Sequence, residues 1–112
     1  MIETNIIPVA TPALVVVVEM EIEPQHCMAF MQLLRRNAAN SRACEDGCLV
    51  FDVCVPEVPQ DPPTVLLYEL YASANAFELH LASEHFKAFD ALTCHMVRKK
   101  SVRRYRLQPW SD

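Results

Sequence analysis

The stretch "ALVVVVEMEI", residues 13–22, decides the fold class of this chain. Its run of β-branched valines predicts a strand. An antiparallel strand with one face in water alternates apolar and polar residues, but residues 14–18 are all apolar. Both faces of the strand should therefore be covered, one by helices and the other by a second sheet. The simplest source of that sheet is another subunit, so we expect a homodimer.

Eight prolines and a few turn residues divide the rest of the chain into periodic segments. Pro24 is suited to the first turn of a helix over residues 24–43. Ser73 and Ser83 can cap two further helices, which should end near residues 82 and 96. The expected strands are residues 13–22, 48–55, 64–71 and 101–107.

This order of elements is β-α-β-β-α(α)-β, which predicts an α+β fold of the ferredoxin-like type. Such a fold has an antiparallel sheet with helices on one face. Residues 1–12 should form a loose N-terminal arm, and the remainder of the 112 residues a single domain.

The composition excludes several classes of function. With 52% hydrophobic and 21% charged residues the chain resembles an ordinary globular protein, and no apolar run approaches the roughly 18 residues of a membrane span. The first twelve residues lack a basic start followed by an apolar core, so we expect no signal peptide and a cytoplasmic location. A single glycine, Gly47, cannot build a phosphate-binding or dinucleotide loop.

The chain has five cysteines, an odd number, and their spacing does not match that of a disulfide-bonded scaffold. The segment "CEDGC", residues 44–48, has no second pair of cysteines or histidines nearby to complete a zinc site. We therefore expect reduced thiols that pack as small hydrophobes.

Six of the ten basic residues lie between Arg98 and Arg106. In a ferredoxin-like sheet that strand lies beside the first strand, whose glutamates can form ion pairs with it. The net charge of −4 and the lack of an aromatic-interleaved basic face argue against nucleic acid.

The segment "FELHLASEHFKAF", residues 77–89, places two histidines at the junction of the last two helices. Helical spacing puts His80 on the same face as Phe77, and His85 on the same face as Phe89. Both imidazoles should point beneath the sheet, where they are either a proton-transfer pair or packed core residues. A metal would need a third ligand of suitable type, and His26 and His95 are remote, so we expect no metal.

Other polar residues also fall on faces that should be buried. Ser41 lies inside the apolar stripe of the first helix and Asn37 at its edge, and Glu69 sits among the apolar residues of "LLYELY". Each needs a partner or a ligand. With Phe51 and Tyr71 they suggest an apolar pocket with a few polar groups, suited to a small organic ligand. Spacing alone assigns no reaction.

Three segments, "EDGCLVFDV", "LLYELY" and "AFELHLASEHFKAF", resemble the antibiotic biosynthesis monooxygenase family, over about residues 13–107. The motifs are similar to the branch of quinol monooxygenases and isomerases of phosphorylated autoinducer-2. The resemblance implies a dimeric α+β barrel with a cavity between sheet and helices in each subunit.

For a quinol-type member the resemblance implies oxidation of an electron-rich aromatic by O2, without metal, flavin or nicotinamide. His80 or His85 would accept the substrate proton and Asn37 would hold the substrate oxygen. In the alternative isomerase, the histidines shuttle a proton beside a carbonyl and Arg104 binds phosphate. A third alternative is a non-catalytic, dimeric ligand-binding module. Phe51, Glu69, Tyr71 and Phe86 complete the expected pocket.

Some relatives degrade haem, and the chain departs from their pattern. Asp90 stands where their haem-ligating histidine would be, and His80 stands in place of their ring-distorting tryptophan. The only tryptophan is Trp110. We therefore expect no haem and no other cofactor.

Overall fold

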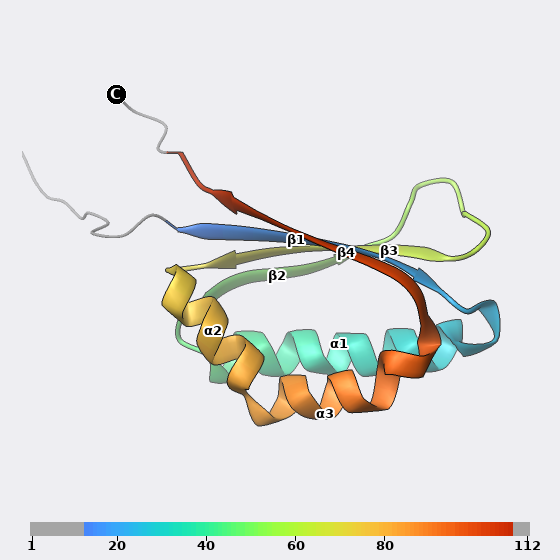
Figure 1. Ribbon diagram of the computed structural model, residues 1–112, viewed down its shortest axis with the longest axis horizontal. Coiled ribbons are helices and arrows are strands. Elements are labelled where there is room, and N and C mark those ends of the chain that lie inside the picture. The colour runs from blue at the N-terminus through green and yellow to red at the C-terminus, as the bar shows by residue number, and fades with distance from the viewer. Residues whose placement is uncertain (1–12, 109–112) are drawn as a thin grey trace, which may run out of the picture.

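The computed structural model describes residues 13–108, so the expected N-terminal arm and Trp110 lie outside the described residues. The fold is the expected α+β arrangement, with a four-stranded antiparallel sheet and helices packed on one face (Figure 1). The elements are β1 (Leu14–Ile22), η2 (Pro24–His26), α1 (Cys27–Cys44), β2 (Cys48–Cys54), β3 (Thr64–Tyr71), α2 (Ala74–Ala82), α3 (Glu84–Thr93), η3 (Cys94–Met96) and β4 (Val97–Arg106).

One boundary differs clearly from the sequence prediction. Strand β4 begins at Val97 rather than at residue 101, because Val97 and Lys99 already pair with Ile22 and Glu21 of β1, with Arg98 at an irregularity between them. The charged side chains of Arg98 and Lys99 are exposed at an edge strand, so this segment lacks the apolar signal by which strands are recognised.

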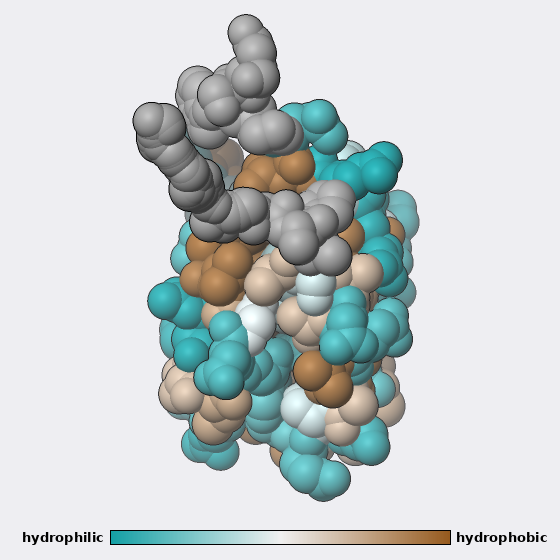
Figure 2. Space-filling view, turned by 90° about the vertical axis from the view of Figure 1, so that its left-hand side faces the viewer, coloured by the Kyte–Doolittle hydropathy of each residue, from teal (hydrophilic) through white to brown (hydrophobic). Residues whose placement is uncertain are grey.

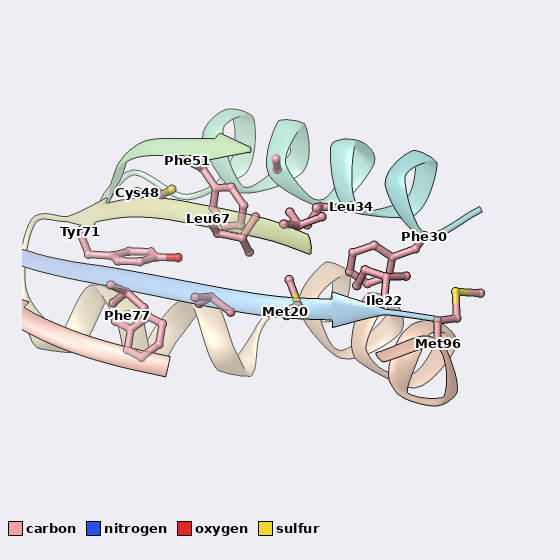
Figure 3. Packing of buried hydrophobic residues seen from close by; sticks show 14 residues of the cluster. Met20, Ile22, Phe30, Leu34, Cys48, Phe51, Leu67, Tyr71, Phe77 and Met96 are labelled. Atoms are coloured by element: carbon pink, nitrogen blue, oxygen red, sulfur yellow. The ribbon is translucent and has the colours of Figure 1, made fainter. Parts of the chain in front are cut away.

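The sheet has the order β2-β3-β1-β4, which places β1 in the interior. Val16 lies opposite Glu69 of β3 and Arg104 of β4. On the helix-facing side of β1, Val16, Val18, Met20 and Ile22 are buried. Figure 3 shows this core, in which Phe30 and Leu34 of α1 and Phe77 of α2 point toward the sheet.

The junction between α2 and α3 depends on one hydroxyl group. Ser83 follows α2 and precedes α3, and its Oγ donates to the His80 carbonyl (2.7 Å) and accepts from the Phe86 N–H (3.3 Å). Ser73 caps the start of α2 by accepting from the Ala76 N–H (3.1 Å). Both serines act as the sequence predicts, satisfying free backbone groups at helix ends.

The sole glycine lies where α2 packs against the turn before β2. A methyl group on Gly47 would come within 2.5 Å of the Ala76 side chain. The Gly47 carbonyl also accepts from the Ala72 N–H (2.8 Å). The absence of a side chain therefore lets the start of α2 approach this turn closely.

The expected pairing of charges between β1 and the last strand is present at the sheet surface. Arg98 contacts Glu23 at 2.9 Å, and Arg103 contacts Glu19 at 3.7 Å. These exposed pairs contribute little to stability.

Within residues 13–108, no helix is both long and apolar enough to cross a membrane.

Candidate functional site

A pocket lies between the helix-facing side of the sheet and helices α1, α2 and α3, with an internal volume of about 60 Å³, or about 460 Å³ when the space of its open mouth is included. Its walls are mainly apolar, with side chains of four phenylalanines. Polar atoms come from Asn37, Glu69, His80 and Lys100. The aromatic lining residues are Phe51, Phe77, Phe86 and Phe89.

Behind one wall of this pocket, a carboxylate joins the two histidines. Glu45, at the end of α1, lies 2.9 Å from His80 Nδ1 and 2.5 Å from His85 Nε2 through the same oxygen, Oε2. Ser41 Oγ lies 3.5 and 3.3 Å from the same two ring nitrogens. The histidines, five residues apart in sequence, therefore meet around one glutamate of another helix.

The hydrogen bonds assign the protons of both rings. The Ser41 hydroxyl donates to the Asn37 carbonyl (2.9 Å), so it offers only lone pairs to the imidazoles. Glu45 also accepts, and His80 Nδ1 and His85 Nε2 must therefore be the donors. In neutral His80 the unprotonated nitrogen is then Nε2, for which residues 13–108 provide no hydrogen-bond partner.

His80 is almost fully buried, and its ring also packs 5.0 Å from that of Phe86. Burial lowers the pKa of His80, and this effect outweighs the opposing influence of the Glu45 carboxylate. The imidazole is therefore neutral near pH 7 and can accept a proton.

A second polar pair occupies the sheet wall of the pocket. The Tyr71 hydroxyl donates to Glu69 Oε1 at 2.6 Å, and Glu69 is 3% exposed. Burial raises the pKa of Glu69 to about 7, although the Tyr71 hydrogen bond and the Lys100 charge lower it. This carboxyl is thus partly protonated at neutral pH.

Asn37 is the third polar feature of the pocket. Its side chain is 4% exposed, and its Oδ1 has no hydrogen-bond partner within the described part of the chain. An unsatisfied buried acceptor costs about 1–3 kcal/mol. A bound hydroxyl group would satisfy this oxygen.

The structure brings most of the expected site residues together. Asn37, Phe51, Glu69, His80 and Phe86 line the pocket directly.

Three expected residues lie outside this lining. Tyr71 reaches the site through Glu69, and His85 faces an outer hollow between α1 and α3. Arg104 is directed elsewhere, with its guanidinium 5.2 Å from the centre of the Phe77 ring and 3.8 Å from the Glu78 carboxylate.

Two residues of the site escaped the sequence analysis. Glu45 lies in the turn between α1 and β2, next to Asp46. A carboxylate in such a turn is ordinarily interpreted as a solvent-exposed side chain. Lys100, the cation that lines the pocket, was counted among the surface charges of the last strand. Its pairing with Met20 places the exposed Lys100 on the helix-facing side of the sheet, at the pocket.

The chain belongs to the antibiotic biosynthesis monooxygenase family, whose model matches residues 13–92. No protein with a curated description matches the sequence.

Solved structures share the fold along nearly the whole chain. A Caulobacter crescentus CB15 protein, described as a candidate antibiotic biosynthesis monooxygenase, has a TM-score of 0.82 at 23% identity, over 88% of this chain and 92% of its own. Rv0793 from Mycobacterium tuberculosis has a TM-score of 0.75 at 25% identity, over 89% and 97%. PA3566 from Pseudomonas aeruginosa has a TM-score of 0.78 at 23% identity, over 88% and 97%.

Proposed function

We propose that this chain is a cofactor-independent monooxygenase that oxidises a small, acidic, quinol-type aromatic substrate with O2. The observation that carries the proposal is the position of His80, a neutral base in the wall of a mostly aromatic pocket, held from behind by Glu45. Family membership supports the same class of reaction.

In this mechanism His80 is the base. Its Nε2 accepts the proton of a substrate hydroxyl, and the resulting imidazolium is stabilised by Glu45 against Nδ1–H. His85, on the other side of the carboxylate, positions Glu45 rather than contacting the substrate. The phenylalanines pack the substrate ring, and Asn37 Oδ1 accepts from a second hydroxyl.

Deprotonation makes the substrate electron-rich enough to reduce O2 directly. Lys100, an exposed residue that lines the pocket, balances the negative charge that develops. For an anthrone, the ring CH2 group loses two hydrogens and gains one oxygen atom, while the second oxygen atom leaves as water. The CH2 group thus supplies all four electrons that reduce O2 to the carbonyl oxygen and one water, and no added reductant is needed.

An oxygen-electrode assay tests the proposal on EDTA-treated protein with a panel of anthrones and hydroquinones. We expect O2 uptake and, with ¹⁸O2, one labelled atom in the product. His80→Ala should lower kcat by about 10²-fold or more, the contribution typical of a positioned base. Glu45→Gln should lower it less, because the imidazole remains but its orientation is no longer fixed.

His95→Ala is the matched control, because His95 is an exposed histidine outside the site. It should retain wild-type turnover. A His80→Ala variant with the wild-type rate, or a wild-type protein that consumes no O2 with any member of the panel, would refute the proposal.

The same assay addresses the two alternatives. An isomerase of a phosphorylated ketone needs a cationic group for phosphate. Lys100, rather than the expected Arg104, lies in the pocket. Isomerisation without O2 uptake, lost in Lys100→Gln, would favour that enzyme. Ligand binding without turnover would favour a non-catalytic module.

We also propose that the protein acts as a homodimer through the face of the sheet opposite the helices (Figure 1). Alternation along the strands places Val17, Leu70, Tyr68 and Tyr105 on that face, and both tyrosines are exposed. Figure 2 shows hydrophobic residues at the level of the sheet where the α2 end of the molecule faces the viewer. A second copy would cover this face.

A further inference from the structure

We propose that Glu45, His80 and His85 form a binding site for one divalent transition-metal ion, with zinc-like preference. The three side chains each offer one ligand atom, and these atoms all lie within 4.8 Å of one another. Glu45 supplies the third ligand that sequence spacing alone did not place beside the two histidines.

The distances are close to those of a metal centre. Metal–nitrogen bonds of about 2.0–2.1 Å and metal–oxygen bonds of about 2.0–2.2 Å place neighbouring ligand atoms about 3.0–3.5 Å apart. Glu45 Oε2 lies 2.9 Å from His80 Nδ1 and 2.5 Å from His85 Nε2. An ion therefore requires an outward shift of the ligands by only some tenths of an ångström to about 1 Å.

The chemistry of the three groups selects the ion. Two imidazoles and one carboxylate suit Zn²⁺, Co²⁺ or Ni²⁺, whereas Mg²⁺ and Ca²⁺ prefer oxygen ligands. Three protein ligands leave at least one coordination position for water. Ser41 Oγ, 3.3 Å from His85 Nε2, can accept a hydrogen bond from that water.

The cluster is also accessible from outside. The His80 side chain is 3% exposed, but the side chains of His85 and Glu45 are 17% and 12% exposed. An ion can therefore enter from the His85 side without passing through the substrate pocket. The remaining two histidines, His26 and His95, contact each other at 5.0 Å between ring centres, but within residues 13–108 they belong to no comparable three-residue group.

A metal ion would take the place of the two N–H protons that now contact Glu45, and each neutral imidazole would then carry its proton on the other ring nitrogen, Nε2 of His80 and Nδ1 of His85. The ion would then hold His80 Nδ1 and withdraw Glu45 from its role as partner of the imidazolium. Metal occupancy and proton acceptance by His80 thus exclude each other, so Zn²⁺ should inhibit turnover. This consequence rests on the proposed function, whereas the metal site itself does not.

Isothermal titration calorimetry with Zn²⁺ tests the site in the substrate-free, full-length protein under reducing conditions. We expect one ion per chain. Glu45→Gln and His85→Ala should each weaken binding by at least about tenfold, since even changes beyond the ligands have effects of this size. The His26→Ala/His95→Ala double variant, which removes the other pair, should bind like wild type.

Co²⁺ provides an independent spectroscopic readout. We expect the d–d absorption of a low-symmetry nitrogen and oxygen site, which His85→Ala abolishes. A thiolate-to-metal charge-transfer band would instead assign the ion to the free cysteines. That band, or unchanged Zn²⁺ affinity in both ligand variants, would overturn the proposal. Because these readouts require no turnover, failure of the metal site is distinguishable from failure of the oxygenase.

Discussion

At the scale of single residues, Glu69 has the most unusual environment in the pocket. It is an acidic side chain on the buried face of β3, and its carboxyl retains one strong hydrogen bond, from Tyr71. Burial disfavours the charged form, which is why its pKa lies near 7 instead of near 4.5. Folding therefore favours the protonated carboxyl.

This environment predicts a specific pH dependence of stability. The folded-state pKa exceeds the unfolded value, so the stabilising contribution is complete below about pH 4.5 and is lost as the pH rises to about 7. The difference between these pKa values corresponds to roughly 3 kcal/mol. Wild type should therefore lose about this much free energy of unfolding between pH 4.5 and 8. Glu69→Gln, whose side chain does not titrate, should not show this loss, so its stability relative to wild type should increase with pH.

Urea unfolding at pH 4.5, 6 and 8, with the protein concentration held fixed, measures this gain. Glu57→Gln, which changes an exposed loop carboxylate, should show no pH-dependent difference from wild type. Parallel pH profiles for Glu69→Gln and wild type would show that the carboxyl is not perturbed by burial.

Residue-level prediction from sequence succeeded where helical or strand periodicity revealed a buried polar group, as for Asn37, Glu69 and His80. It failed for Glu45, because no periodicity extends through the end of α1 into the turn. The contact of Glu45 with His80 spans 35 residues of sequence. Only the packing of α1 against the α2–α3 junction creates it.

At the scale of elements, the two histidines depend on a rigid break between two helices. Ser83 bonds to the last turn of α2 and to the first turn of α3, so one hydroxyl group sets the angle at which the helices meet. His80 and His85 lie on opposite sides of this break. The junction therefore determines whether both rings reach Glu45.

Removing that hydroxyl should disturb stability and site geometry together. Ser83→Ala should lower the free energy of unfolding by about 1 kcal/mol, as for other N-caps. It should also shift the imidazole nitrogen resonances of His80 and His85, because the His80 carbonyl loses its partner. Thermal unfolding and ¹⁵N NMR of the histidine rings measure the two effects.

Ser73→Ala separates the two effects, since it removes a cap of the same kind at the other end of α2. It should cost similar stability but leave the ring resonances unchanged. If both variants shift the resonances equally, the junction has no special role.

Element order and both caps were predictable because serine, proline and valine act on their own segment. The start of β4 was not, since Val97 is followed by the charged residues Arg98, Lys99 and Lys100. Their place in the sheet is determined by pairing with β1, which lies more than seventy residues earlier in the sequence.

At the scale of the whole molecule, the apolar run in β1 explains why the sequence predicts a cover on both faces of the sheet. Four of its residues face the helices, as expected. The apolar residues on its other face, with those of β3 and β4, form the open side of the sheet. Within residues 13–108 no helix packs on that side (Figure 1), so neither periodicity nor the fold of these residues determines what covers it.

The homodimer proposal predicts the effect of a charge placed on this open face. Tyr68→Arg should convert a wild-type dimer into a monomer, because the guanidinium would have to be desolvated at an interface of roughly 800 Å² per partner. Arginine can pair with Asp52, which lies opposite on β2, so the fold itself should survive. Leu79→Arg introduces the same charge at an exposed position of α2 and should leave the dimer intact. Sedimentation velocity at micromolar concentration distinguishes the species, and a monomeric wild type would refute the homodimer.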